Sequence, residues 1–224
     1  MKIIILNGSS RKNGATAAVL NEMHRCLECY PDTEVETIHI SDLALKYCIG
    51  CCKCYETGKC IYQDDIEELS LKIETADGVI FGTPTYAGNV SGQMKTVIDR
   101  GHFIIEQLLY GKYAISVVTY ENYGGRDVAK ILNRLFLYAG AKISGTISAC
   151  VPFRTNPLEN ERLKRYIQKQ AGRFYRDITT KRGYYFQSMK HAVIFRIGIR
   201  PFVRKKGKLY QGVLLRWRRQ HLDC

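Results

Sequence analysis

The sequence predicts an α/β fold, in which helices cover both faces of a doubly wound, five-stranded parallel sheet. Short apolar runs alternate with longer stretches of helical periodicity through the first 180 residues, and parallel strands need such helical crossovers. The run Val-Ile-Phe-Gly at 79–82 is apolar without alternation, which is typical of a central strand buried on both faces. A length of 224 residues with 46% hydrophobic residues is enough for one well-buried domain.

The elements follow one another in a regular order. The expected strands are 2–7, 34–40, 78–84, 113–120 and 142–148. The expected helices are 15–28, 64–76, 91–109, 125–140 and 158–178. Asp64 stands where an N-cap is expected for the second helix. In such a sheet, ligands bind beyond the carboxyl ends of the strands, near the point where strand order reverses. The loops after the first, third and fourth strands are therefore the places to look for a site.

The net charge of +13 is concentrated at the end of the chain. Residues 181–224 hold twelve Lys and Arg against one acid, Asp223, whereas residues 1–180 hold 22 basic and 20 acidic residues. We therefore divide the chain into a domain at 1–180 and a basic, aromatic C-terminal tail at 181–224.

The apolar run at 3–6 is too short for a secretory signal, and no run approaches a membrane span. We expect a cytoplasmic protein, in which clustered cysteines indicate metal, cluster or redox chemistry.

The tail has the pattern of a basic amphipathic helix, which we expect to be interrupted before Pro201. Arginines recur every four residues opposite large apolar side chains. The arginines are Arg196, Arg200 and Arg204, and the apolar residues are Phe195, Ile199 and Phe202 or Val203. Three uses remain open. The tail can pack on the body or on a second subunit, lie on an anionic membrane surface, or contact nucleic acid or an acidic electron-transfer partner.

The loop after the first strand is suited to an anion. The sequence GSSRKNGAT at 8–16 runs directly into a helix, whose first amides favour an anion. Ser9, Thr16 and Asn13 add polar donors, Arg11 adds a charged fork suited to phosphate, and Gly14 lets the backbone approach closely. The alternative is a polar turn with serine caps.

The loops after the third and fourth strands are suited to a flat ring. GTPTYAGNVSGQMKTVIDR at 82–100 contains a rigid exit at Pro84, an aromatic face at Tyr86, and small residues with hydrogen-bond donors. ENYGG at 121–125 continues the pattern, since Gly124 and Gly125 open a helix. Such loops can stack on a planar ring and hydrogen-bond its edges. The alternative for the first of them is a polar turn with a partly buried tyrosine.

These three segments resemble the FMN-binding loops of the flavodoxin-like NAD(P)H-dependent FMN reductases. With CIGCCKCYETGKCIYQDD at 48–65 added, the resemblance extends to the iron–sulfur flavoprotein branch and covers about residues 1–150. It implies a flavodoxin-like sheet with strand order 2-1-3-4-5 and a bound FMN. The implied phosphate ligands are Ser9, Arg11, Asn13 and Thr16, with Gly14 between them. The implied ring-binding residues are Pro84, Thr85, Tyr86, Gly88, Asn89, Glu121, Asn122, Gly124 and Gly125. Ala15 departs from the pattern, because relatives often carry a polar residue there.

The cysteine spacing is C-x2-C-x2-C-x5-C when Cys48, Cys51, Cys54 and Cys60 are taken as ligands. Two gaps of two residues favour a [4Fe–4S] cluster over a zinc ribbon, and the iron–sulfur branch shares this spacing. Zinc, or thiols without metal, remain open alternatives. Cys52 is the expected non-ligand. Gly50 and Gly58 would permit tight turns, and three lysines would offset the charge of the cluster. These lysines are Lys46, Lys53 and Lys59.

The expected function is an FMN-dependent oxidoreductase. It would pass electrons between NAD(P)H or a ferredoxin-type donor and a small acceptor, with or without a [4Fe–4S] cluster. The runners-up are a cluster-free quinone, azo or nitro reductase and a redox-sensing flavin-binding protein. No catalytic acid or base is assigned. Tyr86 and Glu121 are the side chains expected at the reacting face, and Lys95, Asp99 and Arg100 are expected to form structural ion pairs. We further expect a homo-oligomer, either a dimer or a tetramer, with a small-molecule or protein redox partner and no nucleic acid.

Overall fold

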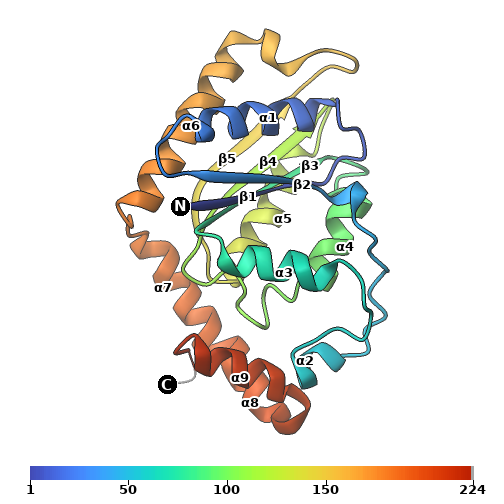
Figure 1. Cartoon of the computed structure of the whole chain (residues 1–224), viewed down its shortest axis with the longest axis vertical. Helices are drawn as coiled ribbons and strands as arrows, with labels where there is room; N and C mark the ends of the chain where they lie inside the picture. The colour runs from blue at the N-terminus through green and yellow to red at the C-terminus, as the bar shows by residue number, and fades with distance from the viewer. Residues whose placement is uncertain (223–224) are drawn as a thin grey trace.

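One parallel sheet organises the fold, and its strand order is β2-β1-β3-β4-β5, as the resemblance implies. The computed structural model describes residues 1–222 (Figure 1). The strands are β1 (Lys2–Asn7), β2 (Glu34–His39), β3 (Gly78–Pro84), β4 (Tyr113–Tyr120) and β5 (Lys142–Cys150). The central strand β3 is buried along its whole length, which confirms the prediction from the apolar run at 79–82.

Helices cover both faces of this sheet, with α1 and α6 on one face and α3, α4 and α5 on the other (Figure 1). In the body of the chain the helices are α1 (Ala15–Glu28), α2 (Lys53–Thr57), α3 (Ile66–Thr75), α4 (Gly92–Arg100), α5 (Gly125–Tyr138) and α6 (Glu161–Thr179). Two short 3-10 turns, η1 (Ile40–Asp42) and η2 (Pro157–Glu159), lie between them. The crossover pattern predicted from the alternating apolar runs is therefore present.

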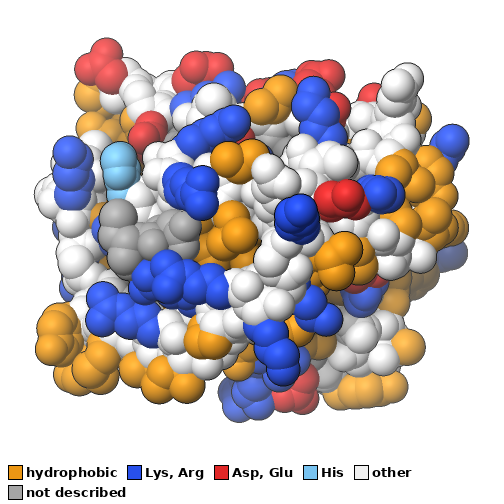
Figure 2. Space-filling model, turned by 90° about the horizontal axis from the view of Figure 1, so that it is seen from below, with side chains coloured by type: hydrophobic (Ala, Val, Ile, Leu, Met, Phe, Trp, Pro, Cys, Tyr) orange, Lys and Arg blue, Asp and Glu red, His pale blue; other side chains and the backbone are white. Residues whose placement is uncertain are grey.

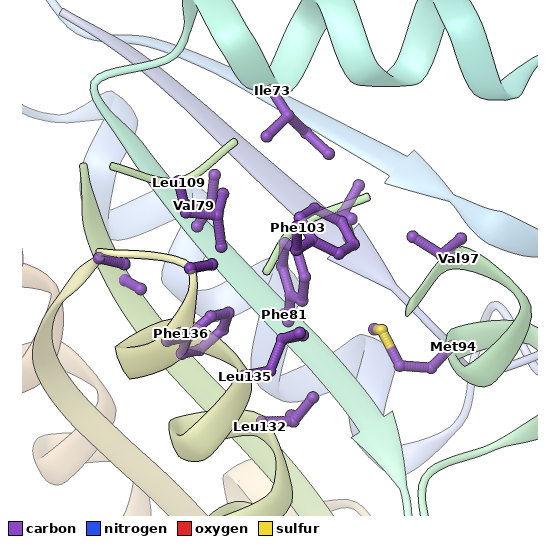
Figure 3. Packing of buried hydrophobic residues seen from close by; sticks show 14 of the residues in the cluster. Ile73, Val79, Phe81, Met94, Val97, Phe103, Leu109, Leu132, Leu135 and Phe136 are labelled. Atoms are coloured by element: carbon purple, nitrogen blue, oxygen red, sulfur yellow. The ribbon is translucent and has the colours of Figure 1, made fainter. Parts of the chain in front are cut away.

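The two faces bury separate hydrophobic cores. On the face covered by α3, α4 and α5, Phe81 of β3 meets the rings of Phe103 and Phe136 edge-on, with centroids 5.6 and 5.1 Å apart. Met94 and Ile73 close this core from α4 and α3 (Figure 3). Burying such side chains fully stabilises the fold by about 1.5–3 kcal/mol each. This core supports the sheet, and the larger of the two candidate sites lies at the carboxyl ends of its strands.

Several predicted helix boundaries differ from the structure by one to three residues, and one differs by nine. The helix expected at 91–109 ends at Arg100, because the chain turns sharply at His102 and Gln107, where φ is +54° and +56°. These left-handed residues cannot continue a right-handed helix. The helix expected from residue 64 starts at Ile66 with Asp65 at its N-cap. The Asp64 carboxylate accepts the Ile66 N–H at 3.4 Å and also binds Arg100.

The tail forms a long helix that passes through Pro201 without a break, contrary to our expectation. It comprises α7 (Tyr185–Val193), a π-helical stretch η3 (Ile194–Ile199) and α8 (Arg200–Lys206), followed by a 3-10 turn η4 (Gly207–Tyr210) and α9 (Gln211–Arg219). A π-helical turn changes the backbone hydrogen-bonding register. Pro201 then falls directly after the π-helical stretch, in the first turn of α8, where the change of register accommodates its missing N–H.

The tail folds back on the body of its own chain. The side chain of Gln187 bonds both backbone groups of Ile143 on the edge strand β5, at 2.8 Å (N) and 3.1 Å (O). Trp217 is buried and donates its ring N–H to the carbonyl of Ile105 at 3.1 Å. The other buried apolar residues of the tail share this third core, and they are Phe195, Ile199, Val203, Tyr210 and Val213. Of the three uses left open for the tail, the structure therefore shows the first, in which the tail packs on the body of its own chain.

Cationic and apolar side chains share the surface at the tail end of the molecule (Figure 2). Phe186 and Ile197 are among the most exposed large apolar residues, at 77% and 75%. Within residues 1–222, no helix is both long enough and apolar enough to cross a membrane.

Candidate functional site

A cavity of about 640 Å³ lies at the carboxyl ends of the strands. Its walls come from the loops after β1, β3 and β4, and also from the loop after β5. This volume is within the range of small-molecule and cofactor sites. The position is the one predicted for a ligand in a doubly wound sheet.

The loop after β1 contributes Arg11, Asn13 and Gly14 to the cavity wall. Gly14 is the N-cap of the 14-residue helix α1, and within the described chain no side chain caps this helix end. The first turn also carries no acidic residue. The amides at the start of a helix attract an anion through their hydrogens and the helix dipole. These three residues and this helix end are therefore suited to a phosphate.

Ser9 and Thr16 were also predicted to bind phosphate, but they are not part of the wall. Both are buried. The Ser9 hydroxyl accepts the Arg11 N–H at 3.2 Å and lies 3.3 Å from the Arg11 carbonyl oxygen. The Thr16 hydroxyl is 2.6 Å from that of Thr119 on β4. These side chains shape the loop and tie it to the sheet.

The loop after β3 places Pro84, Thr85 and Tyr86 in the wall. Tyr86 and Asn89 exchange two backbone hydrogen bonds of 3.0 Å, around Ala87 and Gly88 at φ +49° and +72°. This is the geometry of a type I′ turn. Gly88 and Asn89 thus set the shape of the loop rather than the surface of the cavity.

The unpaired hydroxyl of Thr85 favours a bound ligand in this cavity. It is buried and has no hydrogen-bond partner within residues 1–222. An unpaired buried hydroxyl costs free energy, so a ligand group that pairs with it would stabilise the complex. The half-exposed Tyr86 ring beside it is suited to contact with a flat ring.

The loop after β4 contributes Glu121 to the wall, whereas Asn122, Gly124 and Gly125 are not part of it. The Glu121 carboxylate accepts the backbone N–H of Phe153 at 3.1 Å. It therefore holds the next loop in place, and contact with a reacting group stays a prediction. Gly125 is needed for packing, because a Cβ there would stand 2.0 Å from the Tyr120 ring.

The sequence reading missed the fourth wall of the cavity, which is the loop 151–157 after β5. Phe153 lies between two arginines, with the guanidinium carbons of Arg11 and Arg154 at 5.5 and 5.6 Å from its ring centroid. The signal was present, since β5 ends at the same edge as its neighbours. The prediction covers only the loops after the first, third and fourth strands.

A second, smaller cavity of about 90 Å³ lies among the clustered cysteines. All four predicted ligands line it, namely Cys48, Cys51, Cys54 and Cys60. Cys52, the expected non-ligand, also lines it. A position in the cavity wall therefore does not by itself distinguish the ligands from the non-ligand. Gly50 and Gly58 have φ of +67° and +79°, which are conformations that glycine adopts readily. The two glycines thus make the tight turns expected of them.

Arg100 is the cation that reaches a sulfur in this second cavity. It is 1% exposed and donates from Nη2 to Cys60 Sγ at 3.3 Å. Asp64 holds the same guanidinium through two hydrogen bonds of 2.8 and 2.9 Å. Burial disfavours the charge on Arg100, but the bonds to Asp64 and Cys60 outweigh it and raise the pKa of Arg100. Burial likewise opposes ionisation of Asp64, yet its bonds from Arg100 leave its pKa lowered.

Of the three lysines predicted to offset the cluster charge, two pair with carboxylates, and the third lies over Tyr62, which lines the cysteine cavity. Lys53 pairs with Glu56 at 2.7 Å and Lys59 with Glu67 at 3.0 Å. The ammonium of Lys46 is 5.0 Å from the Tyr62 ring centroid. Arg100 was missed because it was expected in a structural pair on its own helix. That pair does form between Lys95 and Asp99 at 2.5 Å.

The chemistry of the cysteines is compatible with a metal cluster. Burial raises the pKa of the Cys54 thiol to about 12, so a metal-free Cys54 is protonated at neutral pH and would release its proton on binding iron. The Gly50 N–H points to Cys48 Sγ at 3.4 Å, and such bonds stabilise ligand sulfur. Within residues 1–222, no three Cys, His, Asp or Glu side chains come close enough together for one metal ion. In a [4Fe–4S] cluster each thiolate binds a different iron, so its ligands stand further apart.

Comparisons with known proteins agree with the fold and the larger cavity. Residues 1–155 match the family described as NADPH-dependent FMN reductase. The chain is 36% identical over 223 residues to an iron–sulfur flavoprotein of Clostridioides difficile, covering 98% of this chain and 99% of that one. It is 30% identical over 199 residues to an iron–sulfur flavoprotein of Methanocaldococcus jannaschii, covering 82% and 100%.

Solved structures show the same fold at low sequence identity. RosB, with a bound riboflavin-phosphate intermediate, aligns with a TM-score of 0.66 at 16% identity, over 86% of this chain and 85% of that one. The apo form of an NADH:FMN oxidoreductase aligns with a TM-score of 0.59 at 18% identity, over 77% and 87%.

Fold, cavity and family together define an oxidoreductase of the flavodoxin-like fold that uses FMN. The chain belongs to the NADPH-dependent FMN reductase family, in the branch whose members are named iron–sulfur flavoproteins.

Proposed function

We propose that this protein transfers electrons from NAD(P)H or a ferredoxin-type donor to a small acceptor, using FMN and a [4Fe–4S] cluster on Cys48, Cys51, Cys54 and Cys60. Bound FMN supplies hydride chemistry and one- or two-electron transfer. The protein supplies position and electrostatics. The N-terminus of α1 and Arg11 hold the phosphate, and Pro84, Thr85 and Tyr86 support the ring.

The observation that carries the cluster is the shared cavity of the four cysteines, together with the buried Arg100 at one of them. A thiolate-bound cluster is negatively charged, and a buried cation hydrogen-bonded to a ligand sulfur favours the thiolate and tends to raise the reduction potential. The names of the two relatives support the same cluster.

Anaerobic purification, followed by assays of iron, sulfide and flavin, tests this proposal. We expect one FMN and about four irons per chain. Cys54→Ser should lose the iron and keep the flavin, since Cys54 is half-buried at the second cavity and does not line the first. Cys29→Ser is the matched control, because Cys29 is exposed and bonded to the Arg25 carbonyl on α1. Absence of iron after reconstitution would remove the cluster from the proposal.

A cluster-free reductase of quinones, azo or nitro compounds is the second candidate. Within the described chain, no three Cys, His, Asp or Glu side chains are close enough for one ion, which argues against a single bound ion and does not separate this candidate from a cluster protein. This candidate is favoured by the burial of Cys54, which raises the pKa of that thiol to about 12 and so opposes the thiolate form that a metal ligand needs. Full turnover with NAD(P)H and a quinone in iron-free Cys54→Ser protein would support this candidate, and loss of turnover together with iron would exclude it.

A further inference from the structure

The end of the tail lies directly against the cysteine loop, more than 150 residues away in the sequence. α9 and α2 are side by side at the end of the molecule away from α1 (Figure 1). Gly212 of α9 touches the backbone of Gly58, since a Cβ at Gly212 would stand 2.3 Å from the Gly58 nitrogen and 2.9 Å from its Cα. No side chain fits between these two segments.

An aromatic stack joins the same two segments. Tyr210, at the end of η4, stacks on Tyr55 of α2 with ring centroids 4.9 Å apart and planes at 20°. Tyr55 follows Cys54 directly and lines the cysteine cavity. Such an offset stack is favourable beyond the area it buries, and it holds the backbone that carries Cys54.

An ion pair forms a third connection. Arg216 of α9 donates to the buried carboxylate of Glu106 at 3.0 Å, and the other oxygen of Glu106 accepts from His102 Nδ1 at 2.7 Å. His102 lines the cysteine cavity and meets the Tyr55 ring edge-on, with centroids 6.1 Å apart. The tail thus reaches two residues of the cavity wall by separate routes.

We propose that Tyr210, Gly212 and Arg216 are positioning residues of the cysteine site, which hold the cysteine loop in the form that takes up and retains a cluster. This inference rests on the proposed cluster. The loop needs such support because α2 has only five residues and none of them is fully buried. An isolated helix of this length is not stable in water. Contact with the tail provides the packing that the loop does not have.

Hydrogen exchange of the cluster-free protein tests the contact without any metal. In Gly212→Ala we expect the amides of residues 53–58 to exchange about tenfold faster or more, because the new Cβ forces α9 away from α2. Gly198→Ala is the matched control, since it lies in the same tail and its added Cβ has no atom within 4 Å. Unchanged exchange in Gly212→Ala would overturn the proposal.

Tyr210→Ala and Tyr210→Phe provide a second pair of variants, useful if Gly212→Ala fails to fold. Phe keeps the stacked ring, whereas Ala removes it. After anaerobic reconstitution with iron and sulfide, we expect Tyr210→Phe to match the wild type in cluster absorbance. Tyr210→Ala should lose cluster about tenfold faster on exposure to an iron chelator. Equal loss rates for the two variants would contradict the proposal.

The two proposals fail in distinguishable ways. If the wild type takes up no iron, the proposed cluster fails, and the exchange measurement still reports whether the tail holds the loop. If the wild type takes up iron and all four variants match it in exchange and retention, the cluster stands and the positioning role is refuted. FMN binding in each variant confirms that the domain is folded, because none of the substituted residues lines the cavity of about 640 Å³ that is the proposed FMN site.

Discussion

The cavity of about 640 Å³ in which we propose that FMN binds, called the flavin cavity below, and the cysteine cavity are built in different ways. The flavin cavity lies at the ends of buried strands, and backbone hydrogen bonds between neighbouring loops fix its walls, such as the 2.8 Å bond from Thr85 N–H to the Thr119 carbonyl. The cysteine cavity lies in an excursion between η1 and α3 whose own residues are mostly exposed. Side chains from α4 and from the tail hold it. One site is thus part of the sheet, and the other is held by distant parts of the chain.

This difference explains what the sequence could predict. Pro84, Thr85 and Tyr86 could be assigned to the cavity because they directly follow a recognisable strand. The wall formed by 151–157 could have been found by the same rule. Arg100 could not be assigned to Cys60, since its 40-residue separation follows only from how α4 packs. The contact between Gly212 and Gly58 depends on the path of the whole tail, and no local pattern indicates it.

The largest effect should come from removing the cation of the cysteine site. Arg100→Leu leaves Asp64 as a buried carboxylate without its partner, and breaking a buried ion pair in this way costs about 3–5 kcal/mol. The measurement is the free energy of unfolding in urea. Lys95→Met is the control on the same helix, because its pair with Asp99 is exposed and worth about 0–1 kcal/mol. Equal losses for both variants would show that Arg100 does not support the cysteine loop.

The flavin cavity should respond to one methyl group placed against a residue of its wall. Gly125→Ala brings a Cβ to 2.0 Å from the Tyr120 ring, and Tyr120 lines the cavity. We expect the affinity for FMN to fall by about tenfold, or about 1.4 kcal/mol, as measured by flavin fluorescence titration. Gly92→Ala is the control, since Gly92 begins α4 as Gly125 begins α5 and its Cβ would meet open space. Wild-type affinity in Gly125→Ala would show that the Tyr120 ring is not a fixed wall.

The attachment of the tail should depend on pH through His191. This buried residue bonds the side-chain oxygen of Gln107 at 2.7 Å, and burial lowers its pKa below the ordinary value of 6.5. The unfolded chain then binds more protons than the folded one below about pH 6.5, so stability is complete above that pH and is lost as the pH falls. The loss is at most about 1.4 kcal/mol per pH unit. Urea unfolding of the wild type and of His191→Gln at pH 7.5 and 5.5 measures this loss of unfolding free energy. Equal losses in the two proteins would refute the role of His191.

The smallest effect concerns one hydroxyl of the flavin cavity. Because Thr85 Oγ1 is buried without a partner among the described residues, Thr85→Val should leave the flavin-free protein as stable as the wild type or slightly more so. If FMN pairs with this hydroxyl, the same variant loses about 0.5–1.5 kcal/mol of FMN-binding free energy.

Thr83→Val should show the opposite pattern, because the Thr83 hydroxyl bonds the Pro84 carbonyl and the Ser91 N–H, each at 2.9 Å. Its loss should destabilise the flavin-free protein by about 1–3 kcal/mol. Urea unfolding without flavin and fluorescence titration with FMN give both numbers for each variant. If Thr85→Val destabilises the flavin-free protein and binds FMN normally, the hydroxyl is structural and the ring rests on Pro84 and Tyr86 alone.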